Sequence, residues 1–334
     1  MAGPSLAWVP DILGEPFEQL TMPLGIEGAQ GELVATLVRS IPNALQSLFT
    51  PLRDVDVLYV HGWSDYFFQR EVAQFWTSRG ARFYALDLRR YGRSLRDGMT
   101  PGYIDALADY DVDIAAALDA MGQGSPDAAS PRRLVLMGHS TGGLILTLWA
   151  SRHAGRAAAL VLNSPWLELQ LGAIGRHALA PLVEVRAKWD PRGAQPEVDF
   201  GFYTRAQREI GSLPTDPERE RWRPDRGFPT APGWLAAVMD GHRAVAGGLD
   251  VGCPAFVLLS ARSTPQITWK PSMTSTDSVL VVDEIARAAT RIGHDVTIAR
   301  IDGAIHDVFL SRAEPRAAAF SALRRWSAGY IHHS

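Results

Sequence analysis

The feature that most constrains the fold of this chain is an apolar run that leads into a glycine-flanked serine. The run Leu-Val-Leu-Met at residues 134–137 is followed by Gly-His-Ser-Thr-Gly at residues 138–142. Glycines on both sides of a serine let a strand and a helix approach closely around a sharp turn. The serine then takes a strained backbone conformation and presents its hydroxyl at a helix N-terminus, where negative charge is stabilised. The sequence therefore predicts a strand, a turn and a helix, with Ser140 as an exposed nucleophile.

Composition narrows the class of protein. The chain has 334 residues, of which 46% are hydrophobic, enough for a large core. Its net charge of -3 and the lack of a basic block argue against a nucleic-acid or polybasic membrane partner. Cys253 is the only cysteine, which excludes an internal disulfide, and we interpret it as a buried, inert thiol. With no signal peptide and no long apolar run, we expect a cytoplasmic protein without a membrane-spanning segment.

Short apolar strands alternate with segments of helical period, a pattern typical of a mostly parallel sheet covered by helices on both faces. Eight strands are expected, at residues 18–24, 32–39, 55–60, 82–88, 133–137, 158–163, 255–259 and 295–301. The first two are expected to form an antiparallel pair. Helices are expected at residues 69–79, 103–121, 141–153, 234–246, 282–292 and 315–327.

The regular pattern fails between residues 166 and 230, which are rich in proline, arginine and tryptophan. A long irregular stretch inside a compact domain is usually either functional or disordered. Scattered apolar residues such as Leu167, Trp189 and Phe202 favour an ordered cap. We therefore predict a core of residues 1–165 and 231–334, with a cap inserted at 166–230.

A serine nucleophile requires a base, a carboxylate that orients the base, and donors for the developing oxyanion. His306 follows the last expected strand, so it is predicted at the carboxyl edge of the sheet, on the same side as Ser140. We interpret His306 as the base. The other histidines considered precede a strand, end a helix or lie at the terminus, and they are His294, His153, His332 and His333.

The sequence indicates the orienting carboxylate less directly, because no acidic residue comes immediately after the strand at 255–259. The first one is Asp277, ahead of a short apolar step into a helix, and it is our prediction for the orienting acid. The alternatives are Asp283, Glu284 and Glu168. The helix dipole alone explains carboxylates in the first turn of a helix, as for Asp283. Asp307, next to the histidine, is expected either to support the site without touching the reacting groups or to cap its loop.

Two backbone N–H groups are expected to hold the oxyanion. One belongs to Thr141, after the nucleophile, and the other to Trp63, in the loop after the strand at 55–60. We expect His61 to pin this loop rather than to act as a second base. Residues predicted to line the substrate pocket are His61, Gly62, Tyr66, His139 and Trp166. Trp63 could also line an acyl pocket, and Phe67 and Phe68 could equally be pocket or core aromatics.

Four segments in this order resemble the α/β-hydrolase superfamily. They are His-Gly-Trp at 61–63, residues 85–94, the turn at 138–143 and residues 303–306, and together they span residues 55–310. The chain resembles the serine-hydrolase branch with monoacylglycerol lipases, lysophospholipases, S33 serine aminopeptidases and related bacterial esterases. The resemblance implies an eight-stranded α/β-hydrolase sheet, a lid after the sixth strand, and a structural role for residues 87–94. Residues 263–276 depart from the pattern and displace the acid along the sequence.

These residues predict a carboxylic ester hydrolase that forms an acyl-enzyme. Its expected substrate is a small or medium ester with a hydrophobic part, such as a monoacylglycerol or a lysophospholipid. No metal or organic cofactor is expected, and the chain is expected to be a monomer or homodimer. The alternatives are an amide or carbon–carbon bond hydrolase with the same three residues, and a non-catalytic binding protein. Dehalogenase and epoxide hydrolase are disfavoured, because their nucleophile in this fold is an aspartate.

Overall fold

The computed structural model describes residues 7–28, 31–43, 49–124, 132–169, 183, 185–193 and 200–331, and its centre is one twisted sheet. In spatial order, the strands described are β1 (Val9–Pro10), β2 (Glu18–Ile26), β3 (Glu32–Ser40), β5 (Arg82–Asp87), β4 (Val55–Val60), β6 (Arg133–His139), β7 (Ala159–Asn163), β8 (Ala255–Ser260) and β9 (Val296–Ile301). Neighbouring strands from β5 to β9 run parallel, while β1, β2 and β3 add an antiparallel edge. The mostly parallel sheet predicted from the sequence is confirmed.

The sheet contains all eight expected strands and one more. The additional strand, β1, has only two residues, and it pairs with β2 through Val9 and Gln19. Two residues are too few to show the alternation of buried and exposed side chains that marks a strand. Pro10 also lacks a backbone N–H, which suits a sheet edge better than an interior strand. The predicted count of eight was therefore one strand short.

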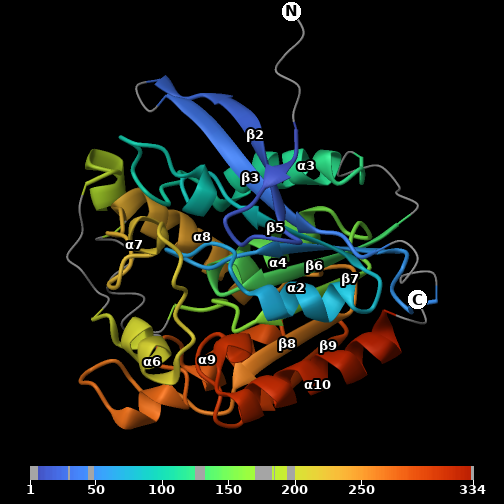
Figure 1. Ribbon diagram of the computed structural model, residues 1–334. Helices are drawn as coiled ribbons and strands as arrows, with labels where there is room; N and C mark the ends of the chain where they lie inside the picture. The colour runs from blue at the N-terminus through green and yellow to red at the C-terminus, as the bar shows by residue number, and fades with distance from the viewer. Residues whose placement is uncertain are drawn as a thin grey trace, which may run out of the picture.

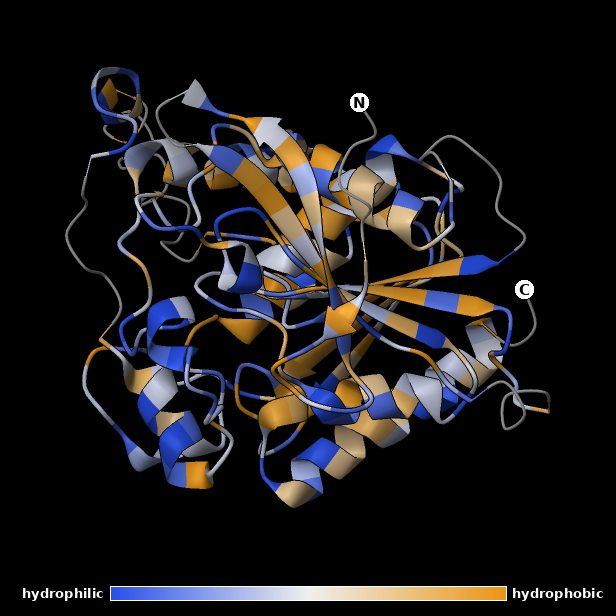
Figure 2. Ribbon diagram, turned by 45° about the horizontal axis from the view of Figure 1, so that its top comes forward, coloured by the Kyte–Doolittle hydropathy of each residue, from blue (hydrophilic) through white to orange (hydrophobic). Residues whose placement is uncertain are grey.

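Helices cover both faces of the sheet, as expected (Figure 1). On one face lie α2 (Arg70–Thr77) and α10 (Ala313–Tyr330), and on the other lie α3 (Asp111–Ala120), α4 (Thr141–Arg152), α8 (Pro232–Gly247) and α9 (Val282–Ala289). Strand β4 explains this layering, because its alternate side chains enter the two cores. Val57 and Tyr59 belong to one core, and Leu58 and Val60 to the other. Figure 2 accordingly shows the central strands as predominantly hydrophobic.

Between β7 and α8 the chain forms α6 (Phe202–Ile210) and α7 (Arg219–Trp222), which lie at one side of the sheet, on the left in Figure 1. Trp222 and Phe228 are buried in the larger core cluster. Arg223 forms a buried ion pair with Asp65, with Nε and Oδ1 3.0 Å apart. These contacts attach the described part of residues 166–230 to the loop after β4. The boundaries of the cap stay a prediction, and residues 170–182, 184 and 194–199 lie outside the described ranges.

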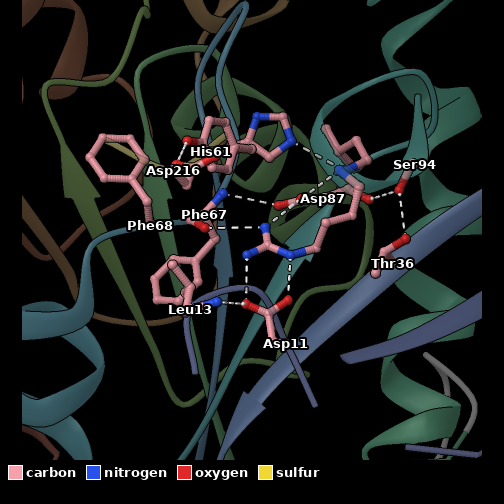
Figure 3. Close-up of polar contacts among 12 residues, drawn as sticks. Asp11, Leu13, Thr36, His61, Phe67, Phe68, Asp87, Ser94 and Asp216 are labelled. Carbon is pink, nitrogen blue, oxygen red and sulfur yellow. Dashed lines mark hydrogen bonds and ion pairs between the residues drawn. The ribbon is translucent and has the colours of Figure 1, made fainter. Parts of the chain in front are cut away.

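The loop after β5 is held by a buried cluster of charges around Asp87 (Figure 3). Asp87 accepts hydrogen bonds from the Phe67 and Arg93 backbone N–H groups, and from Arg93 Nη1 at 2.8 Å. The same guanidinium reaches Asp11 through Nε at 2.6 Å and Nη2 at 2.9 Å. Ser94 Oγ donates to the Asp87 carbonyl at 2.8 Å. These contacts agree with the structural role that the family resemblance implied for residues 87–94.

Replacing Arg93 with methionine is expected to destabilise the fold by about 3–5 kcal/mol, because the change leaves Asp11 and Asp87 buried without their cation. Arg208→Met is the matched control. Arg208 pairs with Asp225 at 2.7 Å, but both side chains are about half exposed, so the expected loss is only about 0–1 kcal/mol. Urea unfolding followed by tryptophan fluorescence measures both. Equal losses in the two variants would show that the buried cluster contributes no more than a surface pair.

Candidate functional site

Ser140 occupies the turn between β6 and α4, with φ 51° and ψ -117°. This left-handed region is strained for a residue with a side chain. The positions on both sides of this turn require glycine, because neighbouring backbone atoms leave no room for a Cβ atom. A Cβ on Gly138 would lie 2.7 Å from the Gly142 carbonyl oxygen, and a Cβ on Gly142 would lie 2.3 Å from the His61 carbonyl oxygen. The predicted strand, turn and helix around Ser140 are confirmed as local structure.

The loop after β9 carries His306, whose ring is almost fully buried. Its Nδ1 lies 2.9 Å from Asp277 Oδ2. The other oxygen, Asp277 Oδ1, accepts the backbone N–H groups of Val279 and Leu280, each at 2.7 Å. A carboxylate only accepts hydrogen bonds, so the proton of the neutral imidazole sits on Nδ1 and leaves Nε2 as a base. The pair has the geometry of an oriented general base.

Asp277 reaches His306 although residues 263–276 separate it from β8. The chain leaves the sheet after Ser260, and the inserted loop comes back beside its own start, because an isolated bridge pairs Ser263 with Asp277. The Asp277 N–H donates to the Arg262 carbonyl at 2.9 Å, and its carbonyl accepts from Thr264 N at 2.8 Å. The acid is therefore displaced along the sequence but lies beside the end of β8.

The alternative acid Asp283 lies elsewhere. Its side chain is about two-thirds exposed and pairs with Arg300 at 2.6 Å. Asp307 caps the loop as predicted, because its carboxylate accepts the Phe309 N–H at 3.0 Å. The structure thus brings Asp277 to His306, whereas Asp283 is engaged at the surface.

The loop after β4 approaches the serine at Gly62, where an added Cβ would lie 3.1 Å from Ser140 Cβ. His61 fixes this loop through both ring nitrogens. Its Nε2 accepts the Leu88 N–H at 3.2 Å, so its Nδ1 carries the proton and donates to the Gly62 carbonyl at 2.7 Å. Burial lowers the pKa of His61, which favours this neutral form. The expected role of His61 as a pin for the loop agrees with these contacts.

The position of the Gly62 carbonyl also sets the direction of the next N–H. In a trans peptide the carbonyl and the following N–H point to opposite sides. Since His61 holds the Gly62 carbonyl, the Trp63 N–H is directed away from the His61 ring. Thr141 is the first residue of α4, and an N–H in a first turn has no acceptor within its helix. Both predicted oxyanion donors therefore belong to segments adjoining Ser140.

Several aromatic residues belong to the segments that adjoin the serine or the histidine. The Trp166 N–H donates to the Ser140 carbonyl at 2.9 Å, and the Trp166 ring lies 6.0 Å from that of Trp234. The Trp63 ring packs against Trp234, with centroids 3.6 Å apart. Tyr203 contacts the His306 ring edge-on at 5.4 Å. Trp234 and Tyr203 were not among the predicted site residues. Trp234 lies at the start of a helix and Tyr203 lies in the irregular 166–230 segment, and neither position carries a sequence motif that indicates a site.

Other expected pocket residues are more enclosed. Tyr66 is fully buried and donates from its hydroxyl to Asp216, which ties the loop after β4 to the 166–230 segment. Phe67 lies in the core rather than in a pocket. His139 is buried, its Nδ1 is 3.0 Å from the Asn163 carbonyl, and its ring is 4.9 Å from His306. Burial lowers the pKa of His139.

The single cysteine lies outside this site. Cys253 is half-buried, whereas a buried side chain was expected. Its partial burial raises the pKa of the thiol to about 12, so the unreactive thiol form is favoured.

Within the described ranges, no group of three or more histidine, cysteine or acidic side chains is arranged to hold a metal ion. No helix in those ranges is long and apolar enough to cross a membrane.

The fold and this arrangement define an α/β hydrolase. Residues 53–258, more than half of the chain, match the family described as serine aminopeptidase, S33, and the chain belongs to this family. No curated protein sequence matches.

Similar solved structures include a monoacylglycerol lipase from Paleococcus ferrophilus (19% identity, 88% of this chain and 99% of that one, TM-score 0.62). A carboxyl esterase from Bacillus coagulans has 14% identity, covers 94% and 99% of the two chains, and gives a TM-score of 0.63. A soluble variant of monoglyceride lipase from Saccharomyces cerevisiae has 15% identity, 93% and 96% coverage, and a TM-score of 0.59. Because these sequence identities are below 25%, the similarity to the three structures establishes the fold alone.

Proposed function

We propose that the protein is a serine-dependent carboxylic ester hydrolase that works through an acyl-enzyme. The observation that carries this proposal is the buried His306–Asp277 pair, which lies on the same edge of the sheet as Ser140 in its strained turn. A serine hydroxyl is a weak nucleophile until a base removes its proton, and the pair provides such a base. Membership of a hydrolase family supports the assignment.

In the proposed reaction, His306 Nε2 takes the proton of Ser140 as Oγ attacks the ester carbonyl. The negative charge that develops on the carbonyl oxygen is held by the N–H groups of Trp63 and Thr141. His306 then passes the proton to the leaving alcohol, and the acyl group stays on Ser140. A water molecule, deprotonated by His306, attacks the acyl-enzyme and releases the acid. Asp277 keeps the imidazole in its Nδ1–H form and stabilises the imidazolium.

The substrate we propose is a small or medium ester with a hydrophobic part. Trp63 and Trp166 belong to the two segments that adjoin Ser140, and their half-buried rings, both near Trp234, offer apolar surface for an acyl or alcohol chain. The 166–230 segment would form a cap over this surface. The names of the similar structures, monoacylglycerol lipase and monoglyceride lipase, favour a monoacylglycerol among such esters. A cytoplasmic location and a monomeric or homodimeric state also stay predictions.

The test is a substrate panel on the purified protein. We expect p-nitrophenyl acyl esters and monoacylglycerols to be hydrolysed, and a fluorophosphonate probe to add one label to the protein. Amino-acid amides and diketones form the comparison set, and the family name makes the amides the first alternative. Cleavage of amides or diketones without any ester would contradict the ester assignment but keep the serine mechanism. No turnover and no label would indicate a non-catalytic binding protein.

A further inference from the structure

The last residue of β7, Asn163, lies between the strand that carries Ser140 and the strand that leads to the acid. The parallel register pairs it with His139 on β6 and with Leu258 on β8. Its backbone carbonyl accepts the Ser140 N–H at 3.1 Å and lies 3.0 Å from His139 Nδ1. The main chain of Asn163 is therefore bonded directly to the serine turn.

The side chain of Asn163 bonds in the other direction, to the residues immediately after His306. Its Nδ2 donates to Asp307 Oδ1 at 2.7 Å, and its Oδ1 accepts the Val308 N–H at 3.2 Å. The residue is 1% exposed, so water cannot replace these bonds. One residue thus connects the turn of the nucleophile to the loop of the base, which are distant in the sequence.

The two contacts require an amide. A carboxylate such as Asp307 only accepts hydrogen bonds, whereas the Val308 N–H only donates. The asparagine amide supplies a donor, the NH₂ group, and an acceptor, the carbonyl oxygen, on the same carbon atom. Aspartate would keep the acceptor for Val308 but would place a second carboxylate against Asp307.

Proton transfer from Ser140 to His306 requires two geometric quantities to be fixed, namely the rotation of the imidazole ring and the separation of the two loops. Asp277 fixes the rotation of the ring through Nδ1. It does not fix how far the histidine loop lies from the turn at Ser140, because Asp277 belongs to a third segment. Gln69 and Tyr203 also bond to Asp307, at 3.2 Å each. The Asn163 side chain, however, belongs to the residue whose carbonyl holds the Ser140 N–H, so it links the histidine loop to that turn directly.

We propose that Asn163 is a positioning residue, which sets the distance between the Ser140 hydroxyl and the His306 imidazole by bonding to both loops. This inference rests on the proposed function, since it concerns the same serine and histidine. Asn163 touches no substrate in this role. Its loss should therefore slow the chemical step while leaving substrate binding nearly unchanged.

The test uses Asn163→Ala and Asn163→Asp in the full-length protein. Gln123→Ala is the matched control, since Gln123 is also a buried amide, with Nε2 2.7 Å from Asp56 Oδ2 beside the opposite end of β4. For each variant we would measure kcat and KM on a p-nitrophenyl ester, the rate of fluorophosphonate labelling, and Tm. Because the backbone bond from Ser140 N survives both substitutions, the turn itself is retained.

We expect Asn163→Ala to lower kcat and the labelling rate by about 10- to 100-fold, with little change in KM, since small misplacements of reacting groups have effects of this size. Asn163→Asp keeps the side-chain volume and the hydrogen bond from Val308, and it should lower kcat and the labelling rate by a similar factor. This variant carries the test if Asn163→Ala does not fold. Gln123→Ala should lower Tm but keep kcat.

Two results would overturn the inference, and they are distinguishable. If the wild type is active and labelled but the Asn163 variants match Gln123→Ala in kcat and labelling, Asn163 is only structural and the proposed function stands. If the wild type neither cleaves esters nor reacts with the probe, the proposed function fails, and the positioning role fails with it.

Discussion

Replacing Ser140 with alanine is expected to lower kcat on p-nitrophenyl esters by about 10⁶-fold, the size of effect seen when a serine nucleophile is removed. In the proposed mechanism, the change deletes the one oxygen that forms the acyl bond. The His306–Asp277 pair and the two backbone donors remain, so a residual rate about 10³- to 10⁴-fold above that in water is still expected. Steady-state kinetics and intact mass after reaction with a fluorophosphonate measure the two consequences.

Ser164→Ala is a sharp control for this result. Ser164 also has a positive φ, 45°, is fully buried, and has no hydrogen-bond partner for its Oγ among the described residues. The same substitution in the same backbone region should leave both kcat and labelling close to those of the wild type. Labelling that persists in Ser140→Ala and disappears in Ser164→Ala would remove Ser140 from the mechanism.

The strands were predictable because each interior strand is apolar on both faces and is bounded by polar turns. Val55–Val60 was expected with the same bounds that the structure gives it, and the other strands differ by two residues or fewer at each end. The helix expected from residue 103 begins as an α-helix only at Asp111, after a 3₁₀ turn at Leu107–Tyr110. Residues 103–106 form no helix. Over four residues a turn of 3.0 residues and one of 3.6 residues bury nearly the same positions, here Leu107 and Tyr110, so periodicity does not separate them.

The arrangement of the candidate site was predictable where a residue's place follows from its position in the sheet. Ser140 comes directly after β6, His306 lies in the loop that follows β9, and the carboxyl ends of parallel strands meet at one edge. Asp277 was harder, because whether its inserted loop returns to β8 depends on the bridge to Ser263, which leaves no periodic signal. Tyr203 gave none either, since it bonds to the Asp307 N–H from 104 residues away. Contacts of this kind arise only when distant segments pack together.

The second large effect is expected at Asp277. Asp277→Asn should lower kcat by about 10⁴-fold, the loss typical of an acid that orients a catalytic histidine. The structure gives a specific reason. Two backbone N–H groups, from Val279 and Leu280, bond to Oδ1 and would keep the carbonyl oxygen of an asparagine in that place. Its NH₂ group must then face His306 Nδ1, so Nδ1 has to accept and the ring proton moves to Nε2.

A protonated Nε2 cannot take the proton of Ser140, so the variant should fold normally and bind substrate but react slowly with both ester and fluorophosphonate. Asp283→Asn is the matched control. Among the described residues, Asp283 forms an ion pair only with the partly exposed Arg300, and the loss of this surface pair should leave kcat unchanged. Comparison of kcat, KM and labelling rate in the two variants tests the assignment. A large loss in Asp283→Asn with little change in Asp277→Asn would transfer the role to Asp283, against the 2.9 Å contact between Asp277 and His306.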